Sequence, residues 1–237
     1  GGNHEKNIIC FLLFFIFGCT ALGGCSNGPK EYQKVLSEEE IALLREDEYP
    51  ICSPHILADK APPMLENTIS IAPYAVLEFV EKLPDIENIH IPVPGTSEAI
   101  LAEKWEIEQY TFYYPSYKFR VIETLTGNIP DYLVGEDKTI TISLPALYLN
   151  GDAALPQFKE GERYIAIVGE SQDGGELSRK YHTAWFDPSC VFYVTDQECV
   201  LSSVMEEGVE KYSGYRLNDF KGILQEMERN PPESVSE

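Results

Sequence analysis

Apolar and polar positions alternate with a period of two in residues 117–125 and 138–144. In the second segment Ile140 and Ile142 alternate with threonines, which places the two kinds of side chain on opposite faces of an extended backbone. Residues 163–168 are almost wholly apolar and rich in β-forming types. These patterns predict three strands, separated by turns that contain Gly and Pro.

A further hairpin is predicted over residues 191–203, with its turn at Asp196 and Gln197. In this register Val194 faces Cys199.

Residues 75–83 (AVLEFVEKL) fit two structures. Val76, Phe79, Val80 and Leu83 have helical spacing, yet the same segment also fits a strand buried on both faces. Periodicity alone does not decide between them.

Two helices are predicted, one before and one after the region that forms strands. Ser37 and Glu40 form a capping box, so a short helix begins there and ends before Pro50. Asn218 is the predicted cap of a C-terminal helix that ends at residues 230–232. Its apolar stripe comprises Phe220, Ile223, Leu224 and Met227.

The 237 residues contain 18 Lys and Arg against 39 Asp and Glu, a net charge of -21. Phosphate binding needs clustered cations, and the sequence has no such cluster, so nucleic acid is not an expected partner. Weak binding of calcium or of a cationic partner is a second interpretation of the acidic surface.

An uninterrupted apolar run at residues 8–17 follows Lys6 and precedes several small residues. A helix of that length measures about 15 Å, roughly half the hydrocarbon thickness of a bilayer. The pattern is typical of a cleavable export signal. The run leads to Leu22-Gly23-Gly24-Cys25.

This tetrapeptide resembles the lipobox of bacterial lipoproteins. The resemblance implies that the signal peptidase recognises Leu22, Gly23 and Gly24, that Cys25 is lipidated, and that Cys25 becomes the first mature residue. Two or three acyl chains would anchor the protein without a transmembrane helix. The expected location is the extracytoplasmic face of the cell membrane.

Three cysteines remain after the lipid site, namely Cys52, Cys190 and Cys199. In the predicted hairpin the last two are offset along the ladder and should not bond to each other. A disulfide from Cys52 to either of them is one alternative, and three separate thiols are the other.

The order of the predicted strands supports a second resemblance, which covers residues 71–204. Its most particular parts are Leu125-Thr126-Gly127 and residues 158–168. The segments are similar to the OB-like barrel of netrin-type and tissue-inhibitor-of-metalloproteinase modules in bacterial surface lipoproteins. The resemblance implies a mainly β (α+β) fold, a small Greek-key β-barrel with a short N-terminal helix and a C-terminal capping helix. Those inhibitors chelate zinc through a cysteine beside the first strand. Cys25 lies far from that strand, so this mechanism is not expected here.

The predicted organisation has six parts: signal peptide 1–24, flexible tether 25–36, short helix and irregular wrap 37–70, β-barrel 71–204, C-terminal helical segment 205–230, and disordered tail 231–237.

The sequence offers little catalytic chemistry. His55, His90 and His182 are scattered among predicted loops, without HExxH or CxxC spacing, so neither a metal nor a cofactor is expected. The remaining candidate site is aromatic, because rings crowd residues 105–119 and OB-type barrels bind ligands with that region. The candidate residues are Trp105, Tyr110, Tyr113, Tyr114 and Tyr117. They fit either core packing or a site for a glycan or a protein.

The leading functional hypothesis is a lipid-anchored, non-catalytic interaction module of the cell envelope, with an envelope protein or a glycan as partner. The alternatives are an envelope hydrolase and a regulator or inhibitor of an extracellular protease.

Overall fold

The structure is a computed structural model that describes residues 31–53, 64–144, 155–171 and 174–231. Contacts divide the chain into Gly1–Glu31 and Tyr32–Glu237, and the description below concerns the second unit.

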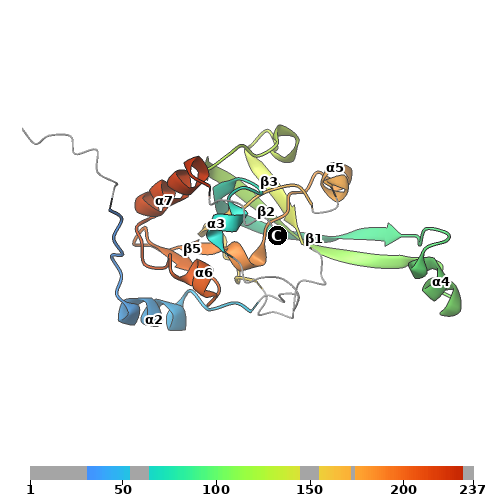
Figure 1. The fold of residues 1–237 in the computed structure, drawn as a ribbon, viewed down its shortest axis with the longest axis horizontal. Coiled ribbons are helices and arrows are strands. Elements are labelled where there is room, and N and C mark those ends of the chain that lie inside the picture. The colour runs from blue at the N-terminus through green and yellow to red at the C-terminus, as the bar shows by residue number, and fades with distance from the viewer. Residues whose placement is uncertain (1–30, 54–63, 145–154, 172–173, 232–237) are drawn as a thin grey trace, which may run out of the picture. The chain divides into compact units, whose positions relative to one another are not determined.

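The second unit is built on one antiparallel sheet of six strands in the order β3-β2-β1-β4-β5-β6 (Figure 1). The strands are β1 (Tyr74–His90), β2 (Tyr110–Thr124), β3 (Thr139–Ser143), β4 (Arg163–Ile167), β5 (Phe192–Val194) and β6 (Val200–Ser202). The first three strands form a meander, and β4 returns beside β1, which is Greek-key order. The antiparallel sheet together with the helices described below makes this an α+β fold. No ladder joins β3 to β6 among the described strands, so a closed barrel is not shown.

Short helices surround the sheet. They are α2 (Glu38–Asp47), α3 (Leu65–Thr68), α4 (Ser97–Lys104), α5 (Glu176–Tyr181), α6 (Glu207–Glu210) and α7 (Leu217–Arg229), with 3-10 turns at η1 (Asp131–Leu133) and η4 (Pro188–Cys190). The predicted capping box is confirmed: Ser37 Oγ accepts from the Glu40 backbone N–H, and Glu40 accepts from the Ser37 N–H. The C-terminal helix begins one residue before the predicted cap, because Arg216 occupies the N-cap position and Asn218 lies inside the helix.

The ambiguous segment at residues 75–83 is a strand, part of β1. Its side chains alternate between two hydrophobic clusters, with Leu77 and Phe79 in one and Tyr74 and Val76 in the other. Both faces of this part of the sheet are therefore buried, which explains why the sequence lacks a polar face here. The second cluster includes Phe220 of α7.

The hairpin of β5 and β6 differs from the predicted register by one residue. Val194 pairs with Val200 rather than with Cys199. The Thr195 N–H donates to the Cys199 carbonyl, and Glu198 has a positive φ of 57°. The turn is thus a three-residue loop whose last residue is left-handed, a common alternative to the two-residue turn.

Of the two alternatives for the cysteines, the structure has three separate thiols, since Cys52, Cys190 and Cys199 are all free and buried. Cys52 contacts the Tyr193 hydroxyl at 3.7 Å. Burial raises the pKa of the Cys190 thiol to about 12, with the Asp187 charge adding to the effect. These thiols pack as small apolar side chains.

Residues at the end of the predicted tether pack against later parts of the second unit. The Val35 N–H donates to the Gly214 carbonyl at 2.8 Å, and Leu36 is buried. Tyr32 donates to Glu226 of α7 at 2.9 Å and occupies the space that a side chain at Gly222 would fill. The chain therefore enters the folded unit beside α7. Within the described residues no helix has the length and apolar character needed to cross a membrane.

Candidate functional site

The two longest strands continue beyond the rest of the sheet. β1 pairs with β4 only through Tyr74–Glu78, and β2 pairs with β3 only through residues 116–120. Beyond these ladders the strands pair with each other as far as His90 and Tyr110. Figure 1 shows this two-stranded extension running away from the other strands to α4. We call residues 84–115 the arm.

Prolines mark the beginning of the arm. The ladder shifts register between Leu83 and Ile86, so Pro84 and Asp85 are left without partners in it. On the neighbouring strand Pro115 lies between the paired residues Tyr114 and Ser116. Proline has no N–H to donate and is found in sheets at bulges and edges. The two prolines therefore mark the position where the strands leave the core sheet and continue as a two-stranded ribbon.

The arm has two different faces. Asn88, His90, Tyr110 and Phe112 are half-buried on one of them, where the rings of Tyr110 and Phe112 stack with centroids 6.3 Å apart. Cross-strand partners share a face, so Glu87, Ile89, Thr111 and Tyr113 form the other, and all four are exposed.

Helix α5 braces the arm. The Tyr181 hydroxyl donates to the Glu87 carbonyl at 3.1 Å and to Asn88 Oδ1 at 3.0 Å. Lys180 Nζ donates to the same Asn88 oxygen at 2.9 Å. These bonds fix the middle of the arm to an element that follows β4, so the arm is supported from the sheet unit.

Helix α4 lies at the end of the arm. Thr96 caps it by accepting from the Ala99 N–H at 3.2 Å. Glu98 lies 3.0 Å from His90 Nε2, which ties the first turn of the helix to β1. Ala102 is the buried residue of this helix, while its larger apolar residues Ile100 and Leu101 face solvent.

Eight apolar side chains are exposed on the arm, and we call this set the apolar tip. It consists of Ile89, Ile91, Val93, Ile100, Leu101, Trp105, Ile107 and Tyr113. Trp105, which is 68% exposed, lies one helical turn after Leu101, which is 54% exposed. A single exposed apolar residue needs no explanation, but eight within one ribbon and its helix make the tip the candidate site.

The five candidate aromatic residues lie in three environments. Trp105 and Tyr113 belong to the apolar tip, whereas Tyr110 and Tyr114 are half-buried on the covered face of the arm. Tyr117 lies outside the arm and packs on Phe158 with ring centroids 5.3 Å apart. Burial raises the pKa of Tyr117. The structure therefore brings together only part of this set.

Sequence reasoning missed the aliphatic part of the tip, chiefly Ile89, Ile100 and Leu101. The sequence of α4 has no amphipathic stripe that would have drawn attention to it. In the structure its large apolar residues Ile100 and Leu101 are exposed instead of buried. One sequence signal could have predicted the helix α4. Thr96 is a typical helix cap, it directly follows Pro94 and Gly95, and good helix formers come after it.

Other chemistry in the described residues is sparse. His90 contacts Glu98 on the arm, and the exposed His182 caps the end of α5, while His55 lies outside the described residues. The described residues contain no cluster of three or more His, Cys, Asp or Glu side chains that could hold a metal.

An open depression of about 670 Å³ lies beside β2 and η1, but it contains no histidine or cysteine. Its lining residues are Val121, Ile122, Glu123, Thr124, Asn128, Ile129, Pro130, Asp131, Val134 and Lys138.

The predicted signal peptide, Leu22, Gly23, Gly24 and the lipidation site Cys25 lie outside the described residues. Comparisons of the chain with protein-family models, with curated proteins and with solved structures found no match.

Proposed function

We propose that this protein is a lipid-anchored, extracytoplasmic interaction module of the bacterial envelope that binds a protein partner through the apolar tip. Its anchor is Cys25. The observation that carries the proposal is the arm, a braced ribbon that holds eight apolar side chains in solvent. The Greek-key order of the strands supports, within this proposal, kinship with OB-like barrels.

The composition of the tip favours a protein over a glycan. Sugars stack on aromatic rings, yet only Trp105 and Tyr113 of the eight side chains are aromatic. The other six are aliphatic, and aliphatic surface is stabilised by burial against apolar groups. A protein surface with an apolar depression supplies such groups.

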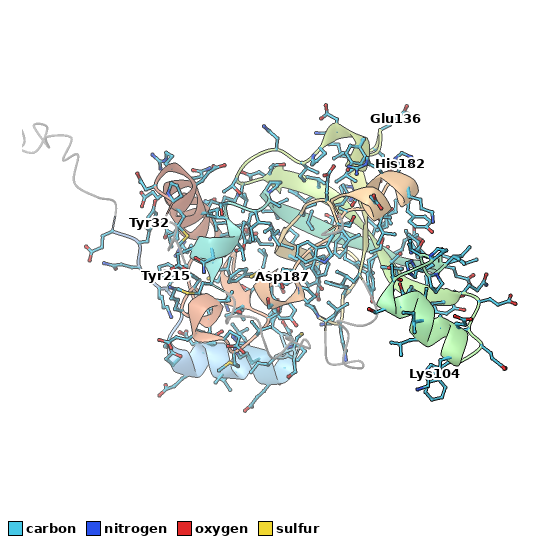
Figure 2. All side chains as sticks on the ribbon, turned by 45° about the vertical axis from the view of Figure 1, so that its right-hand side comes forward. Tyr32, Lys104, Glu136, His182, Asp187 and Tyr215 are labelled. Atoms are coloured by element: carbon cyan, nitrogen blue, oxygen red, sulfur yellow. The ribbon has the colours of Figure 1, made fainter. Side chains whose placement is uncertain are left out.

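The position of the tip relative to the start of the folded unit fits this role. Figure 2 shows Tyr32, which lies within the predicted tether, at the opposite end of the described residues from Lys104 of α4. From Cys25 to Tyr32 the chain spans seven residues, about 25 Å when extended. Within this proposal the anchor is joined to the folded unit at the end opposite α4.

Two measurements test the proposal. The full chain should incorporate radiolabelled palmitate and Cys25→Ala should not. Label incorporated by that variant would exclude Cys25 as the acceptor.

A protein should copurify with the wild-type chain from cells, and Leu101→Ser combined with Trp105→Ser should abolish its recovery. Val35→Ser combined with Met205→Ser is the matched control, since both residues are exposed outside the arm. Identical recovery with the tip and control variants would contradict the proposal.

A further inference from the structure

Carboxylates on strand residues outside the arm and carboxylates on the arm differ in their ionic partners. On the sheet, Glu78 pairs with Arg120 and Glu81 with Lys118. Glu123 pairs with Lys221 of α7, and Arg163 with Glu198. The three acidic side chains on strand residues outside the arm, Glu78, Glu81 and Glu123, are thus all paired within the molecule.

The arm has the opposite character. Its residues include six carboxylates and one lysine, a net charge of -5 with His90 neutral. Only Glu98 has a cationic partner among the described residues, namely His90 if protonated. The five others without an ion pair to any described residue are Asp85, Glu87, Glu103, Glu106 and Glu108, and all five are exposed. Lys104 lies 5.9 Å from the Trp105 ring centroid.

We infer that the partner of the apolar tip is a protein whose apolar depression is bordered by Lys or Arg side chains. This inference rests on the proposed function and names the chemistry of the partner. Unpaired carboxylates surround the apolar residues in the sequence of the arm, as Glu103 and Glu106 do for Trp105. Interfaces commonly combine an apolar centre with a polar rim of complementary charge.

The same charges disfavour two other occupants. A second copy of the chain would bring two tips of net charge -5 together, and juxtaposed like charges oppose association. An anionic lipid surface would repel the arm for the same reason, although exposed Trp, Ile and Leu side chains suit a membrane interface. A cationic rim satisfies both the apolar residues and the carboxylates.

The experiment uses the full chain in the cells that produce it, with photoreactive p-benzoylphenylalanine at position 101 in place of Leu101. Irradiation should yield an adduct with another protein, and the same probe at Ile71, which is 69% exposed outside the arm, should not yield it. Glu103→Lys combined with Glu108→Lys should lower the adduct yield by about threefold to tenfold, the size expected for rim charges. Glu103→Gln combined with Glu108→Gln should lower it less.

The control is Glu46→Lys combined with Glu48→Lys, which makes the same change in net charge at exposed positions near the end of α2. It should leave the yield unchanged. A protein adduct whose yield is equal in the arm and control variants would overturn the cationic rim while leaving the proposed function intact. Adducts only with a second copy or with phospholipid would overturn the partner class. No adduct from position 101 would overturn the inference and the proposed function together.

Discussion

The two halves of the β1–β2 hairpin follow one ladder but meet different surroundings. From Tyr74 to Leu77 every residue of β1 is buried, whereas from Ile86 to His90 half-buried and exposed residues alternate. The pairing partner is β2 in both halves. Pairing alone therefore does not decide whether a strand belongs to the core. Neighbouring strands and helices decide it.

The difference shows how a sheet can produce a projecting surface. In the sheet half, β3 and β4 flank the hairpin and apolar side chains are covered on both faces. In the arm half the flanking strands are absent from the described ladders, and α5 contributes a few hydrogen bonds instead. An isolated two-stranded hairpin is marginally stable in water, so the arm depends on the sheet half and on this brace.

The largest expected effect is loss of a core ring in the sheet half. Phe119 is 1% exposed, and its ring centroid lies 5.1 Å from that of Phe158. Phe119→Ala should lower the free energy of unfolding by about 3–5 kcal/mol, because it removes buried surface and leaves a cavity. Denaturant unfolding measures the change. Phe112→Ala on the half-buried face of the arm is the matched control, and an equal loss there would contradict the distinction between the halves.

Thiol reactivity is expected to separate the two regions next. Because burial raises the pKa of Cys190 to about 12, its reactive thiolate is scarce at pH 8. A cysteine introduced by Tyr113→Cys on the arm should react with iodoacetamide at least about 100-fold faster, since it is exposed and free of this burial. Peptide mass spectrometry after timed labelling gives both rates.

Labelling of Cys190 and of the introduced cysteine at comparable rates in the native protein would show that Cys190 is accessible.

The raised pKa of Cys190 also predicts that the protein loses stability at alkaline pH. Since the folded pKa lies above the ordinary value of 9.0, the contribution of the neutral thiol to stability is present below pH 9 and is lost as pH rises toward 12.

The sheet was largely predictable from the sequence, because its strands alternate or are wholly apolar. The capping box at Ser37 and Glu40 likewise predicted α2. Tertiary context supplied the rest. Residues 75–83 became a strand because β2 and β4 pair with it on both sides, which no local period reveals. The register of β5 and β6 depended on the left-handed conformation of Glu198, a residue that gives no such signal.

The candidate site was less predictable than the fold. Aromatic crowding indicated residues 105–119, which overlap the arm, but Tyr117 is half-buried against the core whereas Trp105 lies in solvent. The burial of an aromatic side chain on β1 or β2 depends on whether β3 or β4 lies beside it. No local sequence pattern predicts that β3 and β4 end before the arm. The aliphatic residues of α4 were missed because methods based on periodicity expect apolar side chains to be buried.

A smaller effect is expected when the brace is removed. Tyr181→Phe deletes the hydroxyl that donates to the Glu87 carbonyl and to Asn88, which should lower the local stability of the arm by about 1 kcal/mol. Amides at residues 86–90 should then exchange with deuterium about fivefold faster, with little change in global unfolding. Tyr132→Phe removes a hydroxyl bound to Glu170 outside the arm and should leave these amides unchanged. Unchanged exchange in Tyr181→Phe would mean that the brace does not hold the arm.

The smallest expected effect on stability comes from the apolar tip itself. Leu101→Ser combined with Trp105→Ser should change the free energy of unfolding by no more than about 1 kcal/mol, because both side chains are exposed and such side chains contribute within about 0.5 kcal/mol each. Trp105 is the C-cap residue of α4, but it caps through its backbone N–H, which the substitution keeps. Loss of partner binding without loss of stability is the behaviour of an interaction surface. A core residue loses both together, as Phe119→Ala should. Unfolding of the double variant at a much lower denaturant concentration would therefore assign Leu101 and Trp105 to packing, and would remove the contrast between the two halves of the hairpin.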